Sequence, residues 1–156
     1  MQPHRKATAI LLCIVLALAA CGGKAYRVHP GAVNTFDSKA YDALLTWYGA
    51  LEQSKTELAA GRIPGGSRTI INKTGAVYNS ARAAWLAYRA AIRAGNATDA
   101  ATAQQDFNRF QTEILSLVDQ LTRLILSADV SAARPALAYT DSDPPEFVPA
   151  VERGNP

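Results

Sequence analysis

ATDAATAQQDFNRFQTEILSLVDQLTRLILSA, residues 97–128, is the stretch that decides the fold. Its apolar side chains recur at alternating spacings of four and three residues: Ala103, Phe107, Phe110, Ile114, Leu117, Leu121, Leu124 and Ala128. This spacing places them on one face of an α-helix, as in helices that pack against other helices. Asn96 or Thr98 can cap the first turn, and Asp99 is favourable beside that end. We therefore predict a helix over about residues 98–128.

Two earlier stretches show the same period. The first has its apolar stripe at Ala40, Leu44, Trp47, Leu51, Ser54 and Leu58. The second has its stripe at Ile71, Thr74, Tyr78, Ala81, Trp85, Tyr88 and Ile92. We predict helices over about residues 38–60 and 68–94.

The ends of these two helices carry recognisable signals. Asp37 or Ser38 can cap the first helix, and Gly61 with the glycine- and proline-containing loop 63–66 ends it. Gly95 closes the second helix in the same way. Gly75 lies inside the second helix, where glycine costs about 1 kcal/mol relative to alanine. We expect the first turns of that helix to fray or to kink at Gly75.

Similar helix lengths joined by short loops favour one all-α domain, an antiparallel three-helix bundle over residues 37–128. The alternative is a helical hairpin whose third helix pairs with another subunit. Residues 129–156 carry five prolines and an acidic excess, so we predict a disordered C-terminal tail. If this tail binds a partner, Phe147, Val148 and Val151 are its apolar contact residues. The other possibility is an inert extension.

The amino terminus has the layout of an export signal. His4, Arg5 and Lys6 precede an apolar run over residues 7–20. These 14 residues are too few to span a bilayer as a helix, which takes about 20. We predict that residues 1–20 are a signal peptide.

Leu18-Ala19-Ala20-Cys21, followed by two glycines, resembles the lipobox of bacterial lipoproteins. This resemblance covers the four residues and the preceding signal only. It implies that Cys21 receives lipid, including fatty acyl chains such as palmitate, and that cleavage follows Ala20. Two or more acyl chains hold a protein durably at a membrane. We expect residues 21–36 to form a lipid-anchored tether on an exported protein, at the cell membrane or the outer membrane.

Charge argues against nucleic-acid binding. Loss of Arg5 and Lys6 with the signal leaves 14 of the 16 basic residues against 13 acidic ones. The working protein is then nearly neutral, whereas nucleic-acid binders carry strongly basic patches. We therefore expect membrane attachment through lipid, and an envelope protein or cell-wall polymer as a partner.

Catalytic and metal-binding patterns are poorly supported. Without the signal, the chain keeps one histidine, His29, and one cysteine, Cys21, which is assigned to lipid. Metal sites need clusters of ligands, and nucleophilic catalysis needs a base beside its nucleophile. We predict neither an enzyme nor a bound metal or cofactor, and we interpret His29 as part of a turn.

Two features remain as functional candidates. Arg82, Arg89 and Arg93 follow one another along the second helix, as an interaction surface or as an ordinary solvated face. The aromatic residues of the first two helices are either core or the lining of an apolar pocket: Trp47, Tyr48, Tyr78, Trp85 and Tyr88. We predict a lipid-anchored helical-bundle module with a binding or structural role at the envelope. The alternative is a carrier of a small apolar ligand.

Overall fold

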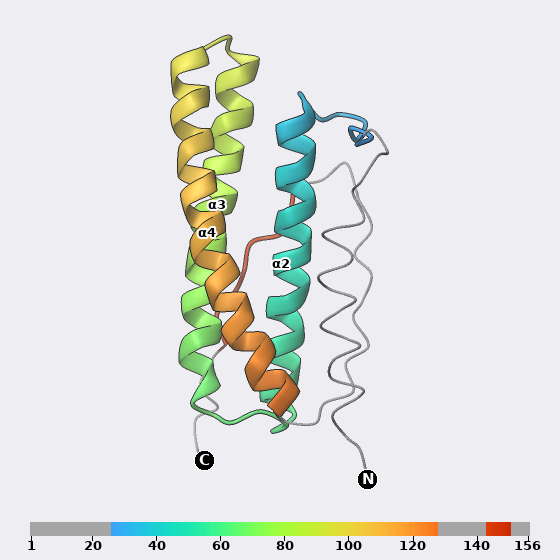
Figure 1. The fold of residues 1–156 in the computed structure, drawn as a ribbon, viewed down its shortest axis with the longest axis vertical. Helices are drawn as coiled ribbons and strands as arrows, with labels where there is room; N and C mark the ends of the chain where they lie inside the picture. Colours follow the sequence, from blue (N-terminus) through green and yellow to red (C-terminus); the bar gives the residue numbers. More distant parts are fainter. Residues whose placement is uncertain (1–25, 128–142, 151–156) are drawn as a thin grey trace.

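The computed structural model describes residues 26–127 and 143–150. Within these ranges it contains three helices in chain order, α2 (Thr35–Ala59), α3 (Ser67–Arg93) and α4 (Ala97–Ser127). They lie side by side, and successive helices run in opposite directions (Figure 1). The predicted antiparallel three-helix bundle is confirmed.

The helix ends follow the sequence signals with one difference. Helix α2 begins at Thr35, earlier than expected, because Asn34 and not Asp37 or Ser38 is its cap. The Asn34 side-chain oxygen accepts a hydrogen bond of 3.0 Å from the Asp37 N–H. Asp37 therefore lies inside the first turn, and its carboxylate is available for other contacts.

The helix ends marked by Gly61, Gly95 and Asn96 are as predicted. Gly61 follows α2 with φ +69°, and Gly95 follows α3 with φ +71°, a left-handed conformation that glycine adopts without steric cost. Asn96 caps α4 by accepting a hydrogen bond of 3.1 Å from the Asp99 N–H. Two short glycine-containing turns thus connect the three helices.

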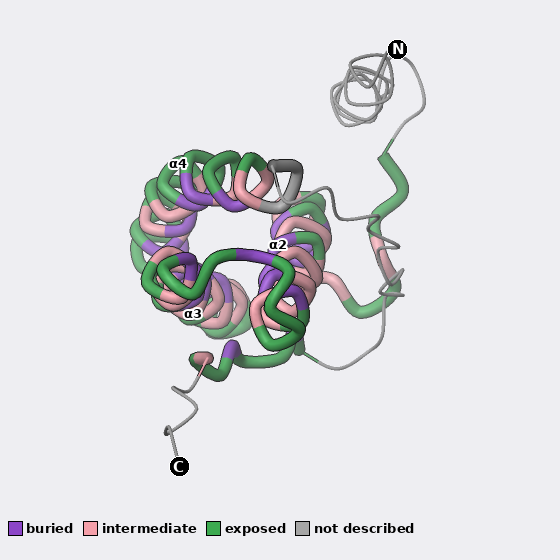
Figure 2. Tube along the Cα trace, turned by 90° about the horizontal axis from the view of Figure 1, so that it is seen from below, coloured by how far each residue is buried: buried purple, intermediate pink, exposed green. Residues whose placement is uncertain are grey.

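The predicted stripes face inward and form the core (Figure 2). In α4, Ile114, Leu117 and Leu121 are at most 5% exposed, whereas Leu115 beside them is 54% exposed. Helices α3 and α4 pack together most extensively, and α2 contacts α3 more than α4. Among the described residues no helix is both long and apolar enough to cross a membrane.

Gly75 does not interrupt α3, contrary to expectation. The helix is continuous over Ser67–Arg93, and Gly75 is buried within it. The physical reason lies in a segment from the other end of the chain, described below.

Residues 143–150 pack on the bundle in an extended conformation. They pass along the junction of α2 and α3 on the side away from α4 (Figures 1 and 2). We name them the docked segment. This part of the predicted disordered tail is ordered, because α3 satisfies its main-chain polar groups and the core buries one of its rings. Residues 128–142 and 151–156, including Val151, lie outside the described residues, as do the predicted signal and Cys21.

Candidate functional site

Two asparagines on α3 each pair with a main-chain residue of the docked segment. The Asn79 side chain donates to the Phe147 carbonyl over 3.0 Å and accepts from the Phe147 N–H over 2.9 Å. Asn72 bonds Ala150 in the same way, donating over 3.3 Å and accepting over 2.9 Å. A side-chain carboxamide donates through its NH2 group and accepts through its oxygen. Each asparagine therefore pairs with the N–H and the carbonyl of one residue, as the backbone of a neighbouring β-strand would. These contacts recognise the polypeptide backbone.

The spacing of the two asparagines matches the spacing of an extended chain. Seven residues separate Asn72 from Asn79, a rise of about 10.5 Å along a helix. Three residues separate Phe147 from Ala150, about 9 to 10 Å in an extended chain. Because the two lengths agree, both pairs form without bending either element. The docked segment runs antiparallel to α3.

The two consecutive prolines of the segment are held through their carbonyl groups. The Tyr78 hydroxyl donates to the Pro145 carbonyl over 2.7 Å, and Arg82 Nε donates to the Pro144 carbonyl over 2.5 Å. Burial raises the pKa of Tyr78 above its ordinary value, and the nearby Arg82 charge only partly opposes this effect. The phenol therefore stays protonated and remains a donor. Since proline has no N–H, neither residue leaves a donor to be satisfied.

Phe147 is the largest apolar side chain that the segment buries and is 2% exposed. Its ring lies on the bare backbone of α3 at Gly75, where an added Cβ would come within 2.0 Å of two ring carbons. From α2, the Lys55 ammonium lies 5.0 Å from the ring centroid. The ring thus fills a slot between the two helices that exists only because residue 75 has no side chain.

Arg89 ties the first residue of the segment to the amino-terminal end of α2. It donates to Asp143 over 3.0 Å and forms an ion pair of 3.4 Å with Asp37. Asp37 is 1% exposed and also accepts from the Trp85 indole over 2.6 Å and from the Val33 N–H over 2.7 Å. A buried carboxylate with these partners fixes α2, α3 and the segment at one end of the groove.

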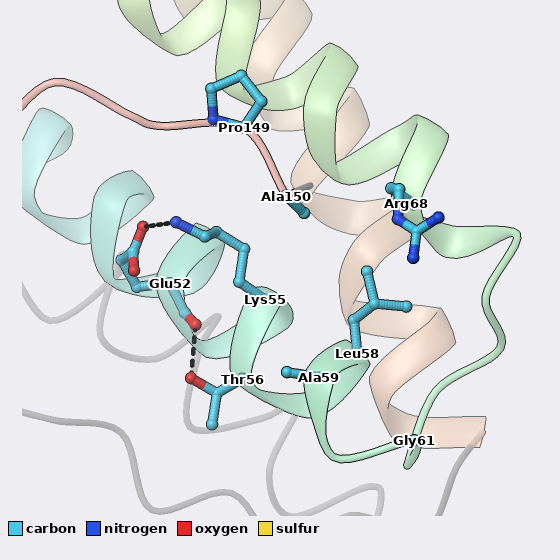
Figure 3. A pocket seen from close by; sticks show the side chains of 9 residues that line it. All are labelled: Glu52, Lys55, Thr56, Leu58, Ala59, Gly61, Arg68, Pro149 and Ala150. Atoms are coloured by element: carbon cyan, nitrogen blue, oxygen red, sulfur yellow. Dashed lines mark hydrogen bonds and ion pairs between the residues drawn. The ribbon is translucent and has the colours of Figure 1, made fainter. Parts of the chain in front are cut away.

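An open pocket of about 580 Å³ lies at the opposite end, where the described segment stops (Figure 3). Pro149 and Ala150 form one wall, with residues from the end of α2 and Arg68 from the start of α3. Lys55 on its rim is paired with Glu52 over 2.9 Å. The groove therefore continues beyond Ala150 as a solvent-accessible hollow.

The three arginines of the predicted interaction surface have different environments. Arg82 and Arg89 are partly buried and hold the docked segment, whereas Arg93 is exposed at the end of α3. The structure thus brings two of the three residues together, in contact with the protein's own chain.

His29 takes part in a polar cluster at the start of α2. Its Nε2 lies 2.7 Å from Asp42 Oδ1, and its backbone N–H donates to the Ser38 hydroxyl over 3.0 Å. Tyr26 bonds the same Asp42 and Ser38 side chains. In the described part of the chain, no three histidine, cysteine or acidic side chains gather as a metal site would require.

The aromatic residues weighed as a pocket lining contribute to the core. Trp47 stacks near Phe107 with ring centroids 6.0 Å apart, and Trp85 packs at 5.8 Å from Tyr41. Tyr88 is buried, and Tyr48 contacts Tyr78 at 5.9 Å. None of these rings lines the pocket beside Ala150.

Sequence reasoning missed Asn72, Gly75, Tyr78 and Asn79 as one surface, although Phe147 was named as a contact residue. A signal was present, because these positions recur three and four residues apart on one helix. Comparison of the chain with protein-family models, with curated proteins and with solved structures gave no match.

Proposed function

We propose that this protein is a lipid-anchored module of the bacterial cell envelope that binds another envelope component through its helical bundle. The lipobox-like Leu18 to Cys21 pattern supports attachment to the cell membrane or the outer membrane. The observation that carries the binding role is the row of α3 side chains bonded to the main chain of an extended segment.

The chemistry of the groove favours a protein partner over a cell-wall polymer. Its carboxamides face a peptide N–H and a peptide carbonyl at the spacing of an extended chain. Its phenol and guanidinium donate to further peptide carbonyls. The proposal involves no chemical step, and it does not use the aromatic core as a ligand pocket, because those rings pack on one another.

The anchor is tested by Cys21→Ser with metabolic fatty-acid labelling and membrane fractionation. The parent chain takes up label and sediments with membranes, whereas the variant stays an unlabelled precursor. Label on the Cys21→Ser protein would show that lipid attaches elsewhere.

The binding role is tested by affinity capture from detergent-solubilised envelopes. Asn72→Ala with Asn79→Ala removes the main-chain contacts, and Leu115→Ala on the exposed side of α4 is the control. We expect the parent and the Leu115→Ala chain to capture the same envelope proteins. The Asn72→Ala, Asn79→Ala double variant should no longer capture them. Identical captured sets from all three chains would contradict a binding role for this groove.

A further inference from the structure

The docked segment is bound as a separable peptide ligand would be bound. Every described hydrogen bond from α3 to residues 144–150 goes to a main-chain group. One ring is inserted at Gly75, while Glu146 and Val148 point to solvent. Recognition of residues 144–150 thus depends on backbone geometry, on three prolines and on one phenylalanine, with the Arg89–Asp143 ion pair added at residue 143. A segment of another protein can supply these groups equally well.

From this we infer that the α2–α3 groove is a binding site for an extended Pro-Pro-x-Phe-x-Pro segment of a partner protein, with residues 143–150 as the resident competitor. This inference rests on the proposed function, which places the protein at the envelope. It adds the class of ligand that the same groove binds. Proline-rich segments suit such a site because they are extended before they bind and lose little entropy.

The bundle is built to survive departure of the segment. Its core is made mainly of stripe residues from the three helices, among them Leu44, Leu51, Ile71 and Ile114, each 0% exposed. From the segment Phe147 joins that core, and Pro144 is the other fully buried residue. Because most of the core comes from the helices themselves, we expect the helix contacts to remain when the segment leaves.

A pocket adjoins the groove where Pro149 and Ala150 line it. The pocket beyond Ala150 offers apolar contact at Leu58 and Ala59 and polar contact at Thr56. A ligand that continues past the position of Ala150 can make contacts in this pocket. The protein's own segment has a high effective concentration at the groove because it is covalently attached to the bundle. Additional contacts in the pocket help a partner segment to compete with it.

The test uses the full chain, purified in mild detergent, and a fluorescent synthetic peptide with the sequence of residues 143–150. Phe147→Ala empties the ring slot but leaves Asn72, Gly75 and Asn79 intact. We expect this variant to bind the peptide at least about tenfold more tightly than the parent, because its own segment competes less. Fluorescence anisotropy measures both affinities.

Two matched controls identify the site. A peptide with alanine in place of its phenylalanine should not bind the Phe147→Ala chain. Adding Gly75→Ala to that chain should abolish binding of the original peptide, because the new methyl group occupies the ring slot. If Phe147→Ala lowers the helical circular dichroism signal, Phe147→Leu replaces it, with a smaller expected gain.

Two results would overturn the inference. One is a helical Phe147→Ala chain that binds neither peptide. The other is a parent chain that elutes as a dimer and becomes monomeric on Phe147→Ala, since a second copy would then fill the groove. If the peptide does not bind but capture of envelope proteins still depends on Asn72 and Asn79, the proline-rich ligand class is wrong. The proposed function as an envelope binding module is then unaffected.

Discussion

Gly75→Ala should destabilise this protein, although the same change stabilises most helices. In an exposed helix interior, alanine is favoured over glycine by about 1 kcal/mol. At residue 75 the added Cβ would lie 2.0 Å from the Phe147 ring, so the ring must leave its slot. Burying a phenylalanine contributes about 1.5 to 3 kcal/mol. We expect a net loss of about 0.5 to 2 kcal/mol in unfolding free energy.

The sign of the effect should depend on Phe147. In a Phe147→Ala background no ring occupies the slot, and Gly75→Ala should then stabilise the chain by about 1 kcal/mol through helix propensity. The double-mutant cycle therefore predicts a coupling of about 1.5 to 3 kcal/mol between residues that are 72 positions apart in the sequence.

Urea unfolding followed by circular dichroism measures all four chains. Stabilisation by Gly75→Ala of about 1 kcal/mol in both backgrounds would refute the reasoning, because it would mean that the Phe147 ring does not rest on residue 75. Destabilisation of equal size in both would mean that the methyl group meets another part of the bundle.

Three further predictions concern the bundle itself. Leu121→Ala should cost about 2 to 5 kcal/mol in urea unfolding, whereas exposed Leu115→Ala should cost little. Asp37→Ala should cost about 3 to 5 kcal/mol in the same assay, because Arg89 loses its buried counter-charge and the Trp85 indole loses its carboxylate acceptor. Burial raises the pKa of Tyr78, so its contribution to stability is full below the ordinary tyrosine pKa of about 10 and is lost as pH rises above it. Tyr78→Phe should flatten that alkaline decline in thermal melting.

The helices could be predicted because their information is local. Apolar residues three and four apart mark the buried face of α4, and Gly61 and Gly95 mark two ends. The cap of α2 was misassigned because Asn34, Asp37 and Ser38 are all competent capping residues. In the structure Asn34 is the cap and the Asp37 carboxylate instead accepts from Trp85, a tertiary contact that no local pattern encodes.

The groove could not be predicted because its contacts join distant parts of the chain. Asn79 and Phe147 are 68 residues apart, and their bonds involve main-chain groups that every sequence has. Helix propensity alone marks Gly75 as a weak point of the helix, whereas its missing side chain is what admits the ring. A glycine within a helical stripe, flanked by asparagines three and four positions away, is the pattern that indicates such a slot.

The antiparallel course of the docked segment along α3 also determines its response to mechanical load. Asp143 is held beside Gly31 and the start of α2, and Ala150 is held at the opposite end of the bundle. Tension between residues near Gly31 and Ala150 therefore acts along the segment, in shear. The Asn72, Asn79 and Arg82 bonds then share the force, together with the seated ring, and must fail together. Force applied across the groove at one end would instead peel them apart one by one, so the same contacts resist one direction of pull far better than the other.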